Sequence, residues 1–484
     1  MSGCIEFVLN GAPRRLPPET RPGQTLLDWL RGPEAGLTGT KEGCAEGDCG
    51  ACTIVAEEPD GRRTPLNACL ALLGQMHGRS LRTVEGLRGA DGAPHPVQRA
   101  MAEADATQCG FCTPGIVMSA WAHARPTEED GGGAHEALAG NLCRCTGYRP
   151  ILEAFSRIPE DVAPAPSPSA PSPAAPPAPA PVALPGGGRF TAGGQDFHLP
   201  ENLASLLTLR AALPEAWLLA GGTDLGLRVS EHRERPPAIL CLSAVPELQR
   251  LEADATGLRI GAGVTYGRLL RLVGQDAGFA PLATLLRRLG SRQIRGMGTL
   301  GGNLGTASPI GDALPPLLAL GARITVASAR AGERVLAADA FFTGYRRTLL
   351  APDEVITRID LPRPPPGAVF ACEKLSKRHD QDISTLSAAF LLRIEGGTIA
   401  GARLAFGGMA ATPAHAPLAE AALTGAPLAD ASFATAAQAL ARDFTPLSDW
   451  RGSAEYRAAG AAGLLRRLYW RVARPDLAME VHAP

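Results

Sequence analysis

Residues 41–52 read KEGCAEGDCGAC, and this stretch decides the fold expected for the first part of the chain. Four cysteines follow the spacing C-x4-C-x2-C with one further thiol downstream: Cys44, Cys49, Cys52 and Cys69. Three thiolates from one loop and a fourth from outside it form the arrangement that holds a [2Fe-2S] cluster in plant-type ferredoxins. Gly43, Gly47 and Gly50 allow strained or left-handed backbone angles, so backbone amides can turn toward the sulfurs.

A second group of thiols follows in the motifs CGFC and CRC, at Cys109, Cys112, Cys143 and Cys145. Pro114 and Pro150 follow the two pairs at positions typical of the first turn of a helix. The positive end of such a helix would face a bound metal, and Arg144 adds a cation beside it. Zinc is the alternative for either group, but the x4 spacing would leave Cys44 without a role, and two neighbouring groups favour two redox centres.

Length and charge limit what else the chain can be. Its 484 residues predict about three domains. With 47 Lys and Arg against 48 Asp and Glu, the net charge of −1 offers no field for nucleic acid, and aromatic residues are only 5%. Neither a secretion signal nor an 18-residue apolar run is recognisable, so we expect a cytoplasmic protein without membrane partners. Cys4, Cys241 and Cys372 lie outside both groups and receive no special role.

The chain divides at a segment rich in proline and alanine, which predicts a semi-rigid linker. Before it, the Asn10-Gly11 turn and a helix cap at Thr25 predict a small mixed β domain, and helical spacing predicts a second unit. After it, strands and helices alternate, and Ala-rich helices are expected on a last sheet. The expected ranges are 1–88, 89–160, the linker 161–186, 187–367 and 368–484. The fold class is therefore multidomain α+β.

The range 187–367 contains glycine-rich runs that suggest a nucleotide site. GMGTLG at 296–301 formally matches G-x-G-x-x-G, but no clear strand precedes it and no acidic residue follows at the required distance. We therefore expect no Rossmann fold, and we expect the run 301–312 to open no helix while still presenting amides and hydroxyls to phosphate. Tight turns without a ligand are the alternative. The side chains of Arg288, Arg292 and Arg295 are expected on a solvated helix face.

These motifs resemble those of a known family. KEGCAEGDCGAC together with QCGFCTPG and GNLCRCTGYRPI resembles the iron–sulfur portion of the molybdenum hydroxylases. The resemblance implies that the eight motif cysteines ligate two [2Fe-2S] clusters, the first in a β-grasp ferredoxin domain and the second in a helical bundle. It also implies that Gln108 lies near a molybdopterin.

The glycine runs extend the resemblance. LLAGGTDL (218–225) and TLGGNLGTASPIGD (299–312) resemble the two FAD-binding segments of the same family, in an α+β FAD-binding domain followed by a C-terminal α/β flavoprotein domain. The implied flavin contacts are Leu218, Ala220, Gly221, Gly222, Thr223, Asp224, Leu225, Thr299, Gly301, Gly302, Asn303, Thr306, Ser308, Asp312, Ile356 and Lys374. Leu289 departs from the aromatic residue found in animal relatives.

The resemblance implies an oxidoreductase chain that receives electrons from molybdenum on a partner. They would pass through the Cys109 cluster, then the Cys44 cluster, to FAD and on to NAD+. No catalytic residue is expected here, because no nucleophile elbow or paired histidine spacing occurs and no molybdopterin domain is recognisable. SKRHDQDI (376–383) and the fusion of clusters with flavin favour the branch that converts hypoxanthine and xanthine to urate.

The expected partner is a large molybdopterin-binding chain, in a heterotetramer of two small and two large chains. Three alternatives remain. The partner could oxidise an aldehyde, carbon monoxide or an N-heterocycle, dioxygen could replace NAD+, or the chain could be a zinc-stabilised scaffold without catalysis.

Overall fold

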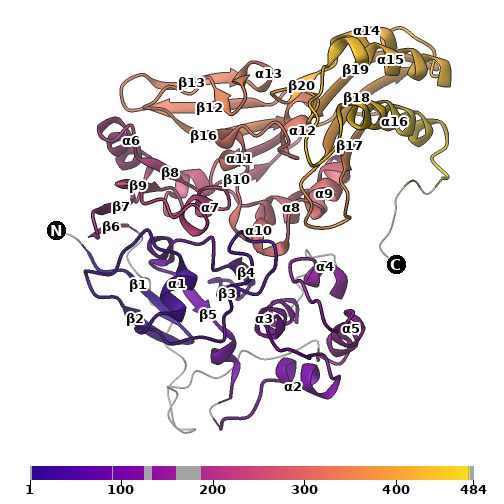
Figure 1. Cartoon of the computed structure of the whole chain (residues 1–484). Coiled ribbons are helices and arrows are strands. Elements are labelled where there is room, and N and C mark those ends of the chain that lie inside the picture. The colour runs from indigo at the N-terminus through magenta and orange to yellow at the C-terminus, as the bar shows by residue number, and fades with distance from the viewer. Residues whose placement is uncertain (1–2, 90, 125–132, 160–186, 478, 480–484) are drawn as a thin grey trace. The chain divides into compact units, whose positions relative to one another are not determined.

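The computed structural model describes residues 3–89, 91–124, 133–159, 187–477 and 479, so the predicted linker 161–186 lies outside the described residues. The chain packs into two compact units (Figure 1). The first comprises Met1–Pro246 with Ser291–Gly298, and the second comprises Glu247–Gly290 with Thr299–Pro484. None of the described helices has both the length and the hydropathy that a bilayer-spanning helix needs.

The N-terminal sheet starts from the predicted hairpin. β1 (Glu6–Leu9) and β2 (Ala12–Arg15) pair antiparallel, and Asn10 and Gly11 between them have φ of 54° and 80°, as a tight turn requires. The strand order is β2-β1-β5-β3-β4, with β3 at Thr53–Glu57, β4 at Arg63–Asn67 and β5 at Ser80–Arg82. Thr25 caps α1 (Leu26–Arg31) as predicted, because its Oγ1 accepts from the Asp28 amide at 3.0 Å. The cysteine loop ends where β3 begins, so this sheet frames it.

Four helices follow in the first unit: α2 (Pro96–Glu103), α3 (Thr113–His123), α4 (Ala134–Leu138) and α5 (Arg149–Ser156). Pro114 and Pro150 lie in the first turns of α3 and α5, which confirms the predicted helix starts. Trp121 on α3 is fully buried. Arg63 on β4 lies over its ring at 4.0 Å and donates to its carbonyl at 2.8 Å, which ties the helices to the sheet.

The rest of the first unit holds a second sheet. Its order is β6-β7-β9-β8, formed by Gly188–Ala192, Gln195–Leu199, Ala238–Cys241 and Trp217–Leu219. α6 (Leu203–Ala212) and α7 (Leu225–Ser230) lie between its strands in the chain. Phe197 and Leu219 share one hydrophobic core with Phe7 of the first sheet. α10 (Arg292–Met297) also belongs to this unit and contacts β4.

The second unit begins with a sheet of order β10-β11-β16-β12-β13, formed by Leu251–Ala253, Gly257–Gly261, Val355–Pro362, Arg323–Ser328 and Gly332–Ala337. Strands and helices alternate in this part of the chain, as the sequence predicts. Its helices are α8 (Tyr266–Gly274), α9 (Ala280–Arg287), α11 (Leu300–Thr306), α12 (Leu314–Ala319) and α13 (Ala338–Phe341), and all five pack into one core with the sheet. A short hairpin follows, β14 (Phe342–Gly344) and β15 (Arg347–Thr348).

The expectation that the run 301–312 opens no helix is wrong. α11 begins directly after Thr299, whose Oγ1 accepts from the Gly302 amide at 2.9 Å. Leu300 and Leu304 on this helix are buried in the core. The threonine cap and these two leucines outweigh the poor helix propensity of the glycines between them.

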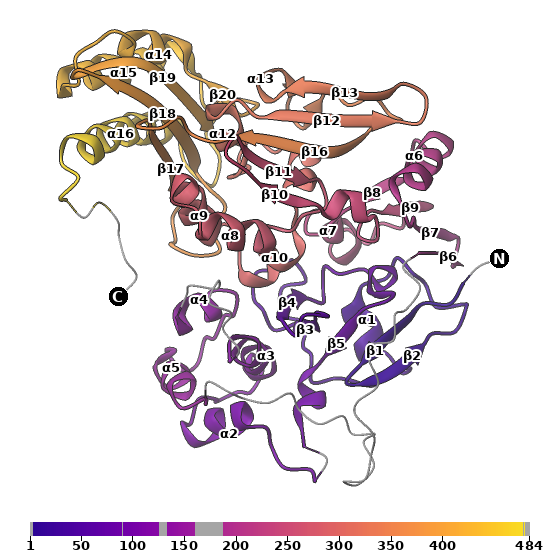
Figure 2. The same cartoon turned by 180° about the vertical axis from the view of Figure 1, so that it is seen from behind.

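The last sheet has the order β17-β18-β19-β20, formed by Val369–Leu375, Leu386–Glu395, Thr398–Gly407 and Ala414–His415. α14 (Pro417–Leu423), α15 (Asp430–Asp443) and α16 (Ala454–Ala473) cover one of its faces (Figure 2). Phe390, Phe406 and Phe433 fill the layer between sheet and helices. The predicted sheet with Ala-rich helices is confirmed in this part of the chain.

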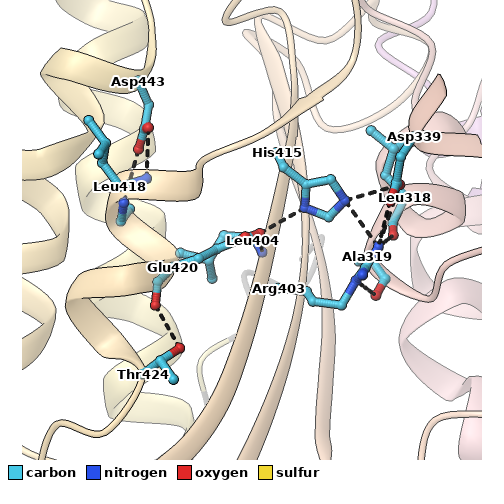
Figure 3. A network of polar contacts seen from close by, with 11 residues as sticks. Leu318, Ala319, Asp339, Arg403, Leu404, His415, Leu418, Glu420, Thr424 and Asp443 are labelled. Atoms are coloured by element: carbon cyan, nitrogen blue, oxygen red, sulfur yellow. Dashed lines mark hydrogen bonds and ion pairs between the residues drawn. The ribbon is translucent and has the colours of Figure 1, made fainter.

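A polar network joins the last sheet of the second unit to α12, α13 and α14 (Figure 3). His415 Nδ1 lies 2.7 Å from Glu420 Oε1, and its Nε2 lies 3.2 Å from both Asp339 Oδ1 and Arg403 Nη2. Arg403 also donates to the carbonyl of Leu318 at 2.7 Å. Burial disfavours the charged imidazole, but the hydrogen bond and charge of Glu420 outweigh it, so the pKa of His415 is raised.

Candidate metal and cofactor sites

The first four cysteines come together as two pairs of thiols. Cys52 Sγ and Cys69 Sγ are 3.3 Å apart and buried, and the Cys44 and Cys49 side chains are in hydrogen-bond contact. Cys52 lies directly before β3, and Cys69 lies two residues after β4, so the β3–β4 pairing brings these two together. Cys44 and Cys49 belong to the loop itself.

The loop backbone turns toward the sulfurs as expected. The amides of Glu46 and Cys49 donate to Cys44 Sγ at 3.4 Å and 3.3 Å. Gly47 and Gly50 have φ of 88° and 68°, which confirms the predicted left-handed angles. Gly43 has no such angle. It is needed for space, because an added Cβ there would lie 2.7 Å from Cys49 Sγ.

Two loop features escaped the sequence reasoning. Ala45 has a φ of 58°, although alanine is not a residue type that predicts a left-handed angle. Asn67 Nδ2 lies 3.8 Å from Cys52 Sγ and supplies a side-chain donor that the cysteine spacing does not reveal. Both features orient the loop around the sulfurs.

The second set of thiols also forms two pairs, in which Cys109 contacts Cys145 and Cys112 contacts Cys143. Thr146 Oγ1 lies 3.2 Å from Cys143 Sγ. The Cys143 amide donates to Tyr148 Oη at 2.8 Å, which fixes the CRC turn against the start of α5. Tyr148 was not foreseen, and its φ of 68° before Arg149 has no sequence signal beyond the preceding glycine.

The paired arrangement fits a two-iron cluster at each set. Each iron of a [2Fe-2S] cluster takes two thiolates, whereas a structural zinc takes four around one point. In both sets the thiols stand two by two. Within one pair, the hydrogen bond from Cys49 lowers the pKa of Cys44 to about 5, and that of Cys49 is raised in turn.

The two cysteine regions touch directly. The Leu142 amide donates to the Cys49 carbonyl at 2.9 Å, and Asn141 Nδ2 donates to the Gly50 carbonyl at 3.1 Å. An added Cβ at Gly50 would lie 1.9 Å from the Gly140 carbonyl oxygen, so this approach needs glycine. The chain therefore holds its two sets of thiols side by side within the first unit.

The first predicted flavin segment lies in the first unit. Residues 218–225 run from the end of β8 through a turn to the start of α7. Gly222 has a φ of 82°, and an added Cβ at Gly221 would lie 1.9 Å from the Met297 carbonyl oxygen. Leu218, Ala220, Thr223, Asp224 and Leu225 are partly exposed around this turn. The Gln75 side chain, not foreseen, donates to the Ala220 carbonyl at 3.2 Å.

The second predicted segment lies in the second unit. α11 carries Thr299 at its cap and Gly301, Gly302, Asn303 and Thr306 along its length, with Ser308 just beyond. It packs against β16, which carries the buried Ile356. Asn303 Oδ1 is buried, and it has no hydrogen-bond partner among the described residues. A buried acceptor without a donor is costly, so this site fits a ligand that can donate, as a flavin nucleotide can.

Asp312 and Lys374 form a buried ion pair in the second unit. Lys374 Nζ lies 2.7 Å from Asp312 Oδ2, with 2% and 8% of the two side chains exposed. Ser384 Oγ donates to Asp312 Oδ1 at 2.5 Å. Burial and the nearby charge of Asp312 raise the pKa of Tyr266, whose hydroxyl is buried. Neither Ser384 nor Tyr266 had a sequence signal, since both contacts depend on long-range packing.

The expectation of a solvated arginine face is wrong for Arg295. Its side chain is 4% exposed, and its Nη2 lies 3.0 Å from Glu136 Oε1 on α4. Arg288 in the second unit donates to the Lys374 carbonyl at 3.0 Å and to Ser376 Oγ at 3.2 Å. Arg295 therefore lies on a buried face of α10, although a charged residue by itself predicts an exposed position.

The chain matches four family descriptions. These are a 2Fe-2S iron–sulfur cluster binding domain (12–73), a [2Fe-2S] binding domain (83–156), an FAD binding domain in molybdopterin dehydrogenase (190–364) and a CO dehydrogenase flavoprotein C-terminal domain (371–472). Together they cover both cysteine sets and both glycine-rich segments.

Curated relatives extend over nearly the whole chain. Xanthine dehydrogenase of Drosophila pseudoobscura pseudoobscura is 34% identical over 519 residues, which cover 94% of this chain and 38% of the relative. Xanthine dehydrogenase/oxidase of Rattus norvegicus is 32% identical, over 84% of this chain and 34% of the relative. The chain thus spans well under half the length of these relatives.

Solved structures agree with these matches. Carbon monoxide dehydrogenase of Hydrogenophaga pseudoflava is similar with a TM-score of 0.53 and 29% identity, over 56% of this chain and 94% of that one. Quinoline 2-oxidoreductase of Pseudomonas putida 86 has a TM-score of 0.52 and 28% identity, over 58% of this chain and 96% of that one. Two [2Fe-2S] domains joined to an FAD-binding domain define an electron-transferring iron–sulfur flavoprotein. The chain belongs to the molybdenum hydroxylase family.

Proposed function

We propose that this chain is the iron–sulfur and flavin subunit of a xanthine dehydrogenase. A molybdopterin-binding partner chain would oxidise hypoxanthine and xanthine to urate, and this chain would pass the electrons to NAD+. The match to xanthine dehydrogenase over 94% of the chain, at 34% identity, carries the proposal. When bound, the clusters supply single-electron transfer and FAD collects electrons in pairs.

The cysteines would hold the two clusters as they are paired in the structure. Cys44, Cys49, Cys52 and Cys69 would bind the first, and Cys109, Cys112, Cys143 and Cys145 the second. The donors already aimed at the first set, the amides of Glu46 and Cys49 and the Asn67 side chain, would hold negative charge on its sulfurs. Thr146 would do the same at Cys143.

Two stretches of this chain would hold the flavin. Residues 218–225 and 299–308 would bind it through turn and helix-start amides and hydroxyls, with Asn303 Oδ1 taking a hydrogen bond from it. The buried pair of Asp312 and Lys374 and the buried Ile356 would also contact the flavin. We also propose the domain boundaries expected from the sequence and a cytoplasmic location.

The surface around the second set would receive the partner. Cys109 and Cys145 are exposed, and so are Phe111 and Leu142, each to 48%. Together with the exposed thiols they would form the apolar patch that the partner covers, since exposed apolar patches mark interaction sites. Gln108 is exposed next to Cys109, which suits its proposed place near the molybdopterin of a heterotetramer with two large chains.

The test is anaerobic reduction of the chain purified with its co-expressed partner. Xanthine should bleach the flavin and cluster absorbance, and NAD+ should restore it. Aldehyde, carbon monoxide and quinoline are the parallel substrates, because the chain also resembles carbon monoxide dehydrogenase and quinoline 2-oxidoreductase. Reduction by one of these but not by xanthine would move the proposal to that branch.

Two further outcomes bear on the proposal. Reoxidation by dioxygen but not by NAD+ would replace the acceptor. A colourless chain with bound zinc would instead make it a scaffold, because [2Fe-2S] clusters and FAD absorb visible light and zinc thiolates do not.

A further inference from the structure

A buried glutamine lies where the two cysteine regions meet. Gln293, the second residue of α10, has no exposed surface. Its segment, Ser291–Gly298, belongs to the first unit, although the chain on either side belongs to the second. These eight residues are therefore a short insertion of the chain into the first unit.

The side-chain amide of Gln293 contacts both cysteine regions. Nε2 lies 3.0 Å from Oγ1 of Thr53, the residue after Cys52, and 3.3 Å from Oδ1 of Asn141, which lies two residues before Cys143. It also lies 3.3 Å from Ser119 Oγ on α3 and 3.4 Å from the Gly140 carbonyl oxygen.

The directions of these hydrogen bonds are consistent. Thr53 Oγ1 donates to the Gly50 carbonyl at 2.6 Å, and Ser119 Oγ donates to Asn141 Oδ1 at 2.6 Å. Both hydroxyls have therefore used their protons and can only accept from Gln293. The Gly140 carbonyl is also an acceptor, so an NH2 group is the chemistry this position requires.

The surroundings leave Gln293 little freedom. An added Cβ at Gly140 would lie 2.0 Å from Gln293 Oε1, and one at Gly115 would lie 2.1 Å from the Gly50 carbonyl oxygen. The ion pair between the buried Arg295 and the partly exposed Glu136 fastens the same helix to α4. Gln293 Oε1 is buried and accepts no hydrogen bond among the described residues, so the side chain joins the two loops through Nε2 alone.

We propose that Gln293 is a positioning residue that sets the spacing of the two clusters by clamping the Cys49–Thr53 loop to the Gly140–Cys143 loop. This proposal rests on the assignment of one cluster to each set of cysteines. Outer-shell groups of this kind typically change the properties of a redox site without being ligands.

The test compares the full-length, iron-loaded chain with Gln293→Met, which keeps the length of the side chain and removes its donors. Gln275→Met, at an exposed position on the second unit, is the matched control. Iron content, cluster potentials and the cryogenic EPR spectrum of the fully reduced chain are measured for each. Rapid-freeze EPR adds the rate of electron transfer between the clusters.

We expect Gln293→Met to keep about four irons. The spin–spin splitting between its clusters should change, and transfer between them should slow about tenfold. Gln275→Met should match the parent chain. Ser119→Ala removes one acceptor of the network and should shift the splitting in the same direction by a smaller amount. If Gln293→Met loses iron, Ser119→Ala is the variant that tests the positioning role.

Unchanged splitting, potentials and rate in the iron-loaded variants would overturn the positioning role. A parent chain without about four irons would instead overturn the cluster assignment. The two failures are therefore distinguishable.

Discussion

The two cysteine regions arrange four thiols in the same way, as two pairs, but in opposite surroundings. In the first, Cys52 and Cys69 are buried between strands, and loop amides point at Cys44. In the second, Cys109 and Cys145 are exposed. Because both sets pair their thiols in the same way, the difference between them lies in how far solvent can reach the cysteines. The first set, called the enclosed set below, has two of its thiols buried within the protein, whereas the second set, called the open set, has two thiols on the surface, where the proposed partner would cover them.

The largest effect is expected when the contact between the two cysteine regions is broken. Gly50→Ala should break it. The left-handed angle should cost the alanine about 1–2 kcal/mol of folding stability. Its collision with the Gly140 carbonyl should cost about 1–3 kcal/mol more. Gly147→Ala is the matched control, since its φ of 67° is almost the same but no atom lies within 4 Å of the added Cβ. Thermal unfolding and iron content check the difference, and equal losses in the two variants would contradict it.

The next effect separates the two sets. Cys52→Ser should reduce the iron content from about four to about two per chain and destabilise the enclosed region, because a buried hydroxyl replaces a ligand. Cys145→Ser should remove a similar amount of iron with little loss of stability, since its position is exposed. Iron analysis with thermal unfolding measures both. Equal destabilisation would show that exposure does not distinguish the sets.

Local chemistry explains which features of these regions could be predicted from the sequence. The spacing around Cys44, the turn at Asn10, the cap at Thr25 and the start of α3 at Pro114 all depend on neighbouring residues. The burial of Gln293 depends instead on partners far along the chain, such as Thr53 and Ser119.

Dependence on distant partners also explains which features of Arg295, α11 and Lys374 could not be predicted from the sequence. Charge counting placed Arg295 in solvent, but Glu136 on a distant helix pairs with it. Glycine content concealed α11, because the buried faces of Leu300 and Leu304 matter more there than propensity. The pairing of Lys374 with Asp312 likewise requires the folded sheet. Sequence motifs identified the ligand types, and packing decided their surroundings.

A smaller effect concerns the open set alone. Phe111→Ala should weaken docking of the molybdopterin-binding partner by about 1–2 kcal/mol, or roughly tenfold in Kd, without loss of iron. Val335→Ala, at a 45% exposed position on β13, is the control and should bind the partner as the parent chain does. Titration of the iron-loaded variants with the partner measures the affinity. Unchanged affinity in Phe111→Ala would mean that the open set faces solvent for another reason.

The smallest effect concerns pH, and it separates the second unit from both cysteine regions. His415 faces Glu420, Asp339 and Arg403, and its pKa is raised in the fold. A raised pKa contributes stability that is fully present below the unfolded value of about 6.5 and is lost as pH rises through the folded value. Peptides around 403–420 should therefore exchange amide hydrogens faster at pH 8 than at pH 6, after correction for intrinsic exchange.

The magnitude should be at most about 1 kcal/mol, because partly exposed ion pairs contribute little. His415→Gln should remove this dependence, and the exposed His379→Gln should leave it in place. Peptides from the two cysteine loops should show no matching change in either variant, since they belong to the first unit. If the His415→Gln chain keeps the full pH dependence, Glu420 and Asp339 do not act through this imidazole.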